Sequence, residues 1–314
     1  MLIDLTVVDR FAAMSAGELR GFFRDSDVLD VTAVIRDASD TELRRLIEIE
    51  QFRDEGVVAI LDRFPEFADH QRLGEISGVV RFDLARGKKE VERHTARFGG
   101  GEVTLVPDAD PDVTICADIV DFVRLVTGQS NAALLYLGGR MDIHGDALLA
   151  LAVGTVFRVP GSDHAAVDPT ALDPVDVATA VATTSGKHMR SVMEGGFRPI
   201  VLEEVFRRFP DFIDSGKAAD LRLTVGFRIG GRRDGEVDRY TVHVHDGACT
   251  IETEPPEGQR RDATISLDGA DFLRLATGQL HPVRGVLTGA MKVKGDRAKA
   301  LALNAVMVPP KPRT

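Results

Sequence analysis

One long segment of this chain occurs twice. DFVRLVTGQS, residues 121–130, and DFLRLATGQL, residues 271–280, lie 150 residues apart. The match continues without a gap through LYLGGRMDIHGDALLALA (135–152) and GVLTGAMKVKGDRAKALA (285–302). Two copies of roughly 140 residues are too few and too long for a solenoid of short repeats. The chain is therefore expected to fold as two tandem domains of one kind.

The match also extends toward the N-terminal side of each copy. DRFPEFAD (62–69) matches RRFPDFID (207–214), and the pair Phe-Arg at 52–53 matches Phe-Arg at 197–198. The offset is 145 here and grows to 150 because the second copy carries two insertions, GGRRDG and EPPEGQRRD. Both are rich in turn-forming residues, and insertions in surface loops leave a packed core intact.

These boundaries predict an N-terminal domain of residues 1–158, with extra helices at its start, and a C-terminal domain of residues 175–314. Residues 159–174 between them contain three prolines and little periodicity, so they are expected to form a linker.

Composition excludes several classes of protein. The 44% apolar residues can fill two cores. The net charge of −10, with no dense basic run, opposes nucleic-acid binding. Two cysteines are too few for a disulfide framework and favour a reducing compartment. Charged residues within the first ten positions exclude a signal peptide, and the longest apolar run, 147–157, is far shorter than the roughly 20 residues of a membrane span. A cytoplasmic protein is expected.

Each copy shows the same order of elements: helices, strands, a helix, a strand and a last helix. Ser39 and Glu42 form a capping-box pattern ahead of a helix. Alternating segments such as ISGVVRFDLA and EVERHTARF are typical of half-buried antiparallel strands. The pattern predicts an α+β fold, in which a mostly antiparallel five-stranded sheet is covered by helices.

The second copy resembles the sterol carrier protein family of the type-2, or nonspecific lipid-transfer, kind. The resemblance is most specific in DFLRLATGQLHPVRGVLTGAMKVKGD (271–296), which is similar to the family's helix, TG-K/Q-L-x-P turn, apolar helix and G-x-hydrophobic-x-hydrophobic-x-GD strand. The first copy departs at the turn, where SNA replaces LHP. The resemblance implies two tandem sterol-carrier-like domains, each with an apolar cavity for a sterol, a fatty acid or a fatty acyl-CoA.

The last predicted strand carries an alternation that points to this cavity. Met291 and Val293 alternate with Lys292 and Lys294, so two apolar side chains face the helices and two charges face outward. The residues alone allow either a solid core or a tunnel at this place, and the resemblance favours the tunnel. The predicted cavity residues are Phe272, Leu275, Ala276, Val283, Val286, Leu287, Met291 and Val293 in the second copy, and Phe122, Leu125, Leu135, Met141 and Ile143 in the first.

A basic group occurs in the second copy alone. It consists of Lys292, Lys294, Arg297 and Lys299, whereas the first copy has an acid, a histidine and two apolar residues at these positions. The group is either an ordinary solvated face or a docking patch for anionic headgroups or the phosphates of coenzyme A. The second reading predicts transient contact with an anionic membrane.

Candidate catalytic patterns are weak. His243 and His245 lie on one face of a predicted strand and could share a metal, but no further ligand is evident, and an exposed strand face is the simpler interpretation. Cys116 matches Ser266 in the other copy, as expected of a small packing residue. GFRIGGRR resembles a phosphate loop, but its glycines precede a hairpin and not a helix. No catalytic residue, metal or cofactor is predicted.

The sequence therefore predicts a protein without catalytic activity that binds, and transfers within the cell, an apolar ligand. Two alternatives remain: an assembly protein with filled cores, or an accessory subunit of a lipid-modifying enzyme. A homodimer is also open, because Leu148, Leu149 and Leu151 place apolar groups on several faces of the first copy's last helix.

Overall fold

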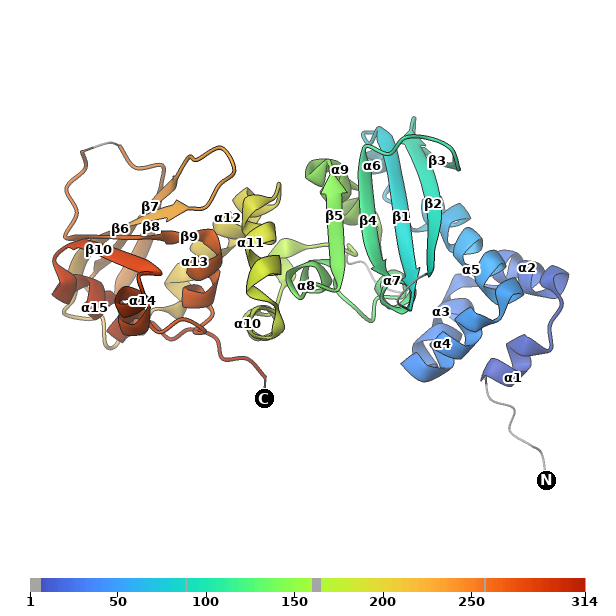
Figure 1. Ribbon diagram of the computed structural model, residues 1–314, viewed down its shortest axis with the longest axis horizontal. Helices are drawn as coiled ribbons and strands as arrows, with labels where there is room; N and C mark the ends of the chain where they lie inside the picture. The colour runs from blue at the N-terminus through green and yellow to red at the C-terminus, as the bar shows by residue number, and fades with distance from the viewer. Residues whose placement is uncertain (1–6, 88–89, 160–164, 257, 314) are drawn as a thin grey trace, which may run out of the picture. The chain divides into compact units, whose positions relative to one another are not determined.

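The computed structural model describes residues 7–87, 90–159, 165–256 and 258–313 (Figure 1). The prediction about a signal peptide depends partly on residues 1–6, and the predicted linker includes residues 160–164; these positions lie outside the described residues. The chain divides into two compact units, Met1–Tyr136 with Arg140–Asp168, and Leu137–Gly139 with Pro169–Thr314. No helix in the described ranges combines the length and apolarity needed to cross a membrane.

Helices precede and follow the strands of the first unit. Its elements are α1 (Val7–Ala12), α2 (Ala16–Asp25), α3 (Val28–Asp37), α4 (Asp40–Glu48), α5 (Glu50–Asp62), η1 (Phe64–Phe67), α6 (His70–Leu73), β1 (Gly78–Arg86), β2 (Glu90–Gly99), β3 (Glu102–Leu105), β4 (Val113–Asp118), α7 (Ile119–Val126), α8 (Ala132–Leu137), β5 (Met141–Gly145) and α9 (Ala147–Val156).

From its second element onward, the second unit repeats the order that the first unit shows from α3 onward, without a described counterpart of α6. Its elements are η2 (Pro169–Ala171), α10 (Pro174–Thr183), α11 (Gly186–Glu194), α12 (Arg198–Arg208), η3 (Phe209–Phe212), β6 (Arg222–Gly230), β7 (Asp238–His245), β8 (Ala248–Thr253), β9 (Ala263–Asp268), α13 (Gly269–Ala276), α14 (Pro282–Thr288), β10 (Met291–Gly295) and α15 (Arg297–Val306).

Each unit contains one five-stranded sheet, with strand order β3-β2-β1-β4-β5 in the first and β10-β9-β6-β7-β8 in the second. Neighbouring strands are antiparallel except for the pairs β1–β4 and β6–β9, which are parallel. The predicted α+β fold with mostly antiparallel five-stranded sheets is thus confirmed. The one parallel pair in each sheet arises because β4 and β9 follow a loop that carries the chain to the far side of the first strand.

The helix caps explain where the repeated helices begin. Ser39 accepts a hydrogen bond from the Glu42 amide and the Glu42 carboxylate accepts one from the Ser39 amide, so the predicted capping box is present. Ser185 caps α11 at the matching position, and Asp27 and Asp173 cap α3 and α10 in the same way. The repeat therefore starts with the helix pair α3–α4, earlier than the sequence match indicated.

Helices cover one face of each sheet. In the second unit α13, α14 and α15 pack against β6, β9 and β10 (Figure 1). Asp296 begins α15 by accepting bonds from the Ala298 and Lys299 amides, and Asp146 begins α9 in the same way, as predicted. The chain therefore returns from the last strand directly onto the covered face.

The last helix of the first unit, α9, is apolar on more than one face. Part of the predicted linker covers it: the Val167 amide donates to the Gly154 carbonyl at 3.1 Å, and a Cβ on Gly154 would lie 2.5 Å from a Val167 methyl group. Leu148 remains 68% exposed. The predicted packing of α9 against another domain or chain thus stays a prediction, now limited to the side that carries Leu148.

Candidate ligand-binding cavity

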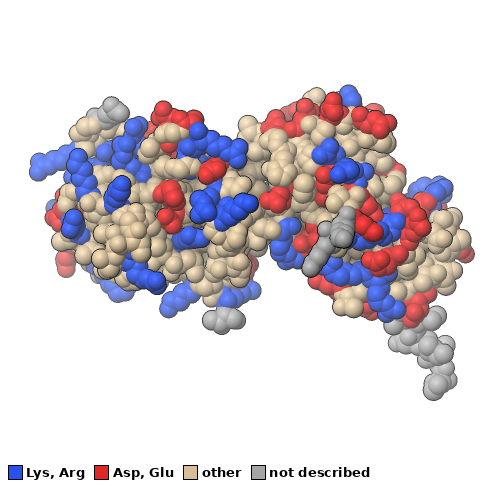
Figure 2. Space-filling view, viewed as in Figure 1, with Lys and Arg blue, Asp and Glu red and all other residues tan. Residues whose placement is uncertain are grey.

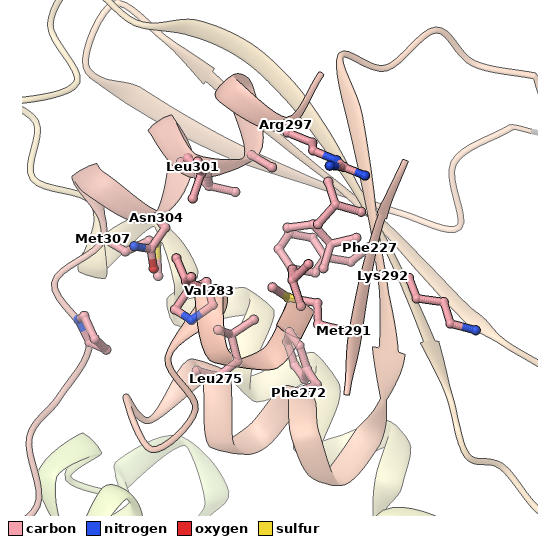
Figure 3. A pocket seen from close by; sticks show the side chains of 18 of the residues that line it. Phe227, Phe272, Leu275, Val283, Met291, Lys292, Arg297, Leu301, Asn304 and Met307 are labelled. Carbon is pink, nitrogen blue, oxygen red and sulfur yellow. The ribbon is translucent and has the colours of Figure 1, made fainter. Parts of the chain in front are cut away.

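The second unit contains a cavity of about 470 Å³ between the covered face of its sheet and helices α13, α14 and α15 (Figure 3). Most of its wall is apolar, and the polar side chains among its described lining residues belong to Lys292, Arg297 and Asn304. The other lining residues are Phe209, Phe227, Ile265, Phe272, Leu275, Ala276, Pro282, Val283, Val286, Leu287, Gly289, Met291, Val293, Ala300, Leu301, Leu303, Met307 and Pro309.

The strand register and the helix period direct these side chains into the cavity. Met291 and Val293 of β10 pair with Leu267 and Ile265 of β9, and residues paired across antiparallel strands share one face of the sheet. On α13, Phe272, Leu275 and Ala276 follow the spacing of one helix face. Side chains from separate segments therefore meet around one volume.

All eight cavity residues predicted in the second copy line this cavity. Phe272 and Met291 are buried at its base, whereas Leu287 is 80% exposed at its edge. Figure 3 shows Leu275, Val283 and Met291 directed toward the empty volume. That these side chains contact a ligand stays a prediction.

The predicted basic group divides into two parts. Lys292 and Arg297 belong to the cavity wall, although the Lys292 side chain points away from the empty volume (Figure 3), and Lys294 is exposed on the same strand. Lys299 is half-buried, and its ammonium group donates to the Arg222 carbonyl at 2.5 Å. Within the described residues, Lys299 therefore has a hydrogen bond that the other three members of the group lack.

Sequence reasoning missed about half of the wall. Phe209 and Phe227 come from segments far before the quoted motif, whereas Leu301 and Asn304 come from α15 and Met307 directly follows it. The helical spacing of these last three residues was a signal that could have identified the α15 face. The two phenylalanines had weaker signals in the sequence. Phe227 follows the alternation of β6, and Phe209 belongs to the repeated RFP motif.

Four of the five cavity residues predicted in the first copy belong to one hydrophobic cluster, and that they contact a ligand stays a prediction. Leu135 and Met141 form a buried cluster with Ala117, and Leu125 and Ile143 pack against it. The first copy also has Phe122, which is 2% exposed.

Two exchanges between the copies alter the packing at matched positions. A Cβ on Gly285, which matches Leu135, would lie 3.4 Å from Met291 and 3.5 Å from Leu280, so these two side chains adjoin the position at which the first copy carries a leucine. Phe157 matches Met307 and stacks on Phe64 with ring centroids 4.2 Å apart, whereas Met307 borders the cavity.

The SCP-2 sterol transfer family model matches residues 58–158 and 202–308, one segment in each unit and together more than half of the chain. The chain belongs to the SCP-2 sterol transfer family. The resemblance drawn from the second copy is thereby confirmed, and it extends to the first copy despite the altered turn. All the residues that line the cavity except Pro309 lie in the second of the two SCP-2 segments.

Relatives of this SCP-2 protein differ in length and in name. Sterol carrier protein 2 of Arabidopsis thaliana is 43% identical over 90 residues, 28% of this chain and 72% of that protein. Hydroxysteroid dehydrogenase-like protein 2 of Xenopus tropicalis is 23% identical over 106 residues, 34% of this chain and 24% of that protein, so the match spans about a quarter of its length. The solved apo form of sterol carrier protein 2 from Yarrowia lipolytica is 21% identical, with a TM-score of 0.28 over 35% of this chain and 90% of that one.

His243 and His245 of β7 lie on the face of the sheet away from the helices, each near hydrogen-bonding groups. His243 is 3.3 Å from the Thr224 hydroxyl and 3.3 Å from a Glu252 carboxylate oxygen, and His245 is 3.1 Å from Asp246. In the part of the chain that the structure describes, no three His, Cys, Asp or Glu side chains gather as metal ligands would. This geometry accounts for His243 as a member of a polar surface network.

The two thiols are expected to react slowly in the folded protein. Burial raises the pKa of Cys249 to about 11 and also raises the pKa of Cys116. Because the thiolate is the reactive form, Cys249 should be alkylated by iodoacetamide roughly a hundredfold more slowly near pH 8 than a thiol of pKa 9.0. Mass spectrometry of native and urea-unfolded samples measures both rates, and equal rates would contradict the raised pKa.

Proposed function

We propose that the second unit of this SCP-2 protein binds one apolar molecule, a sterol, a fatty acid or the acyl chain of an acyl-CoA, in its cavity and transfers it within the cytoplasm. The observation that carries the proposal is the apolar volume of about 470 Å³ inside an SCP-2 segment. Burying an acyl chain there gains roughly 0.8 kcal/mol per methylene, which exceeds the entropic cost of binding after a modest chain length.

The cavity wall favours binding without chemistry. Its polar side chains are those of Asn304, Lys292 and Arg297, and this set contains no carboxylate, imidazole, thiol or hydroxyl of the kind that usually serves as general base or nucleophile. We therefore propose a non-catalytic role for this unit. Two free cysteines fit the proposed cytoplasmic location.

Binding is expected to be direct and saturable. Delipidated full-length protein should bind a fluorescent fatty acid or a fluorescent sterol with a Kd in the micromolar range or tighter, at about one molecule per chain. Solvent extraction of the protein as purified, followed by mass spectrometry, should identify an apolar molecule in near-stoichiometric amount. The absence of a saturable signal with every apolar probe would favour an assembly protein instead.

A second candidate function is presentation of the ligand to an enzyme. It is favoured by the relative named as hydroxysteroid dehydrogenase-like, which is about four times longer than its match to this chain. Under this proposal the same cavity would hold the substrate of a separate protein. Copurification of an enzyme with the ligand-loaded chain, but not with the delipidated chain, is the observation that would distinguish presentation from transfer.

A further inference from the structure

The mouth of the cavity carries an unusual group of apolar side chains. Val283, Val286 and Leu287 of α14 are 46%, 42% and 80% exposed, and Leu301 of α15 is 51% exposed. All four also line the cavity, so their exposed apolar surface borders one volume. We call these four residues the apolar rim. Contiguous exposed apolar surface of this kind marks a place that another apolar phase covers.

Basic side chains lie beside the apolar rim. Arg284 lies between rim residues on α14, Lys292 and Lys294 follow on β10, and Arg297 begins α15; all four are exposed. Figure 2 shows uncharged surface over α14 with lysine and arginine side chains around it. Within the described residues these four cations form no ion pair. The surface beside the apolar rim is therefore positively charged, although the net charge of the chain is −10.

We propose that the apolar rim docks on the surface of an anionic lipid bilayer. Leu287 and Leu301 enter the boundary between headgroups and acyl chains, and the four cations contact the anionic headgroups. The cavity mouth then faces the bilayer, so an apolar ligand passes between membrane and cavity without crossing water. This transfer step rests on the proposed ligand binding, whereas the docking itself does not.

Charge selects the bilayer over a second copy of the chain. In a symmetric dimer the same patch meets itself, which would place four cations of one rim against four of its partner. Such like-charge contact is unfavourable, whereas an anionic surface attracts each of the four. The first unit has no matching patch, since Asp142 and His144 replace Lys292 and Lys294 there and Ala133 replaces Val283. Docking is therefore a property of the second unit.

The test compares vesicle binding by the full-length protein and its variants. Wild-type protein should bind vesicles of phosphatidylcholine with phosphatidylglycerol and bind pure phosphatidylcholine weakly, and salt should weaken the binding. Leu287→Gln/Leu301→Gln should bind the mixed vesicles about tenfold more weakly or worse. Leu148→Gln is the matched control, because it changes a leucine that is 68% exposed in the first unit, and it should bind like wild type.

A charge variant separates docking from ligand binding. Arg284→Glu/Lys294→Glu changes two cations outside the cavity wall, so it should keep its affinity for a fluorescent fatty acid in solution. Its vesicle binding should fall by roughly fivefold or more per charge reversed. If the wild-type protein bound vesicles but no fluorescent fatty acid, the proposed function would be refuted and the docking proposal would stand.

Three results would overturn the docking proposal. One is equal vesicle binding by wild type and both double variants. Another is vesicle binding whose affinity does not change with the fraction of anionic lipid or with the salt concentration. The third is a dimer in light scattering that Leu287→Gln/Leu301→Gln dissociates, which would show that a second copy covers the rim.

Discussion

Replacing Met291 with tryptophan is expected to abolish ligand binding while leaving the stability of the protein close to that of wild type. Met291 is 4% exposed on β10 and its side chain borders the cavity of about 470 Å³. The larger ring can enter this empty volume and occupy the space of an acyl chain. Excluding only three methylenes removes roughly 2.4 kcal/mol, or about fiftyfold in Kd. Titration with a fluorescent fatty acid and thermal unfolding measure the two effects.

Met141→Trp is the matched control in the first unit. Met141 is 3% exposed and packs in a cluster with Ala117 and Leu135, so the ring has to displace core atoms. Overpacking of this kind costs about 1–3 kcal/mol. This variant should lose stability and keep ligand binding, the reverse of Met291→Trp. If Met291→Trp bound ligand like wild type, the ligand would occupy a different site.

The wall of the cavity was predictable where local periodicity decides which way a side chain points. Met291 and Val293 follow from the two-residue period of a strand, and Phe272, Leu275 and Ala276 follow from the period of a helix. Because the repeat has no gap in this region, each of these residues could also be matched to a residue of the other copy. These residues could be predicted because the strand and helix periods are set by neighbours that are close in the sequence.

The volume itself was not predictable, because it depends on contacts between segments that are far apart. Phe157 stacks on Phe64 in the first unit, whereas Met307 at the matching position borders an open cavity with Phe209. A phenylalanine and a methionine are equally compatible with the end of an apolar helix. Only the folded arrangement distinguishes packed core from cavity.

The strand pairing shows the same limit. The alternation in β4 and β9 predicts a half-buried strand but carries no information about which neighbour it joins. The parallel pairs β1–β4 and β6–β9 depend on the path of the preceding loop. Similarly, the helix pairs α3–α4 and α10–α11 have matching caps but few identical residues, so the sequence match stopped short of them.

Arg198→Met is expected to cause the largest loss of stability of any substitution considered for this protein. Arg198 is 4% exposed. It donates to Asp238 at 2.7 Å, to the Met193 carbonyl at 2.6 Å, and to the Ile229 and Gly230 carbonyls at 2.8 Å each. Methionine fills a similar volume but leaves these acceptors without their donors. Breaking a buried pair of this kind costs about 3–5 kcal/mol.

The first unit supplies the control, since Arg53 matches Arg198. Arg53 lies 2.5 Å from Glu92 and donates to one carbonyl, that of Ile47, at 3.3 Å. Because fewer buried acceptors depend on it, Arg53→Met should cost about 1–3 kcal/mol. Urea unfolding of both variants, with ligand binding as the readout for the second unit, measures the difference. If Arg198→Met unfolded at the urea concentration of wild type, the backbone carbonyls around it would have other donors and the arginine would not hold α12 to the end of β6.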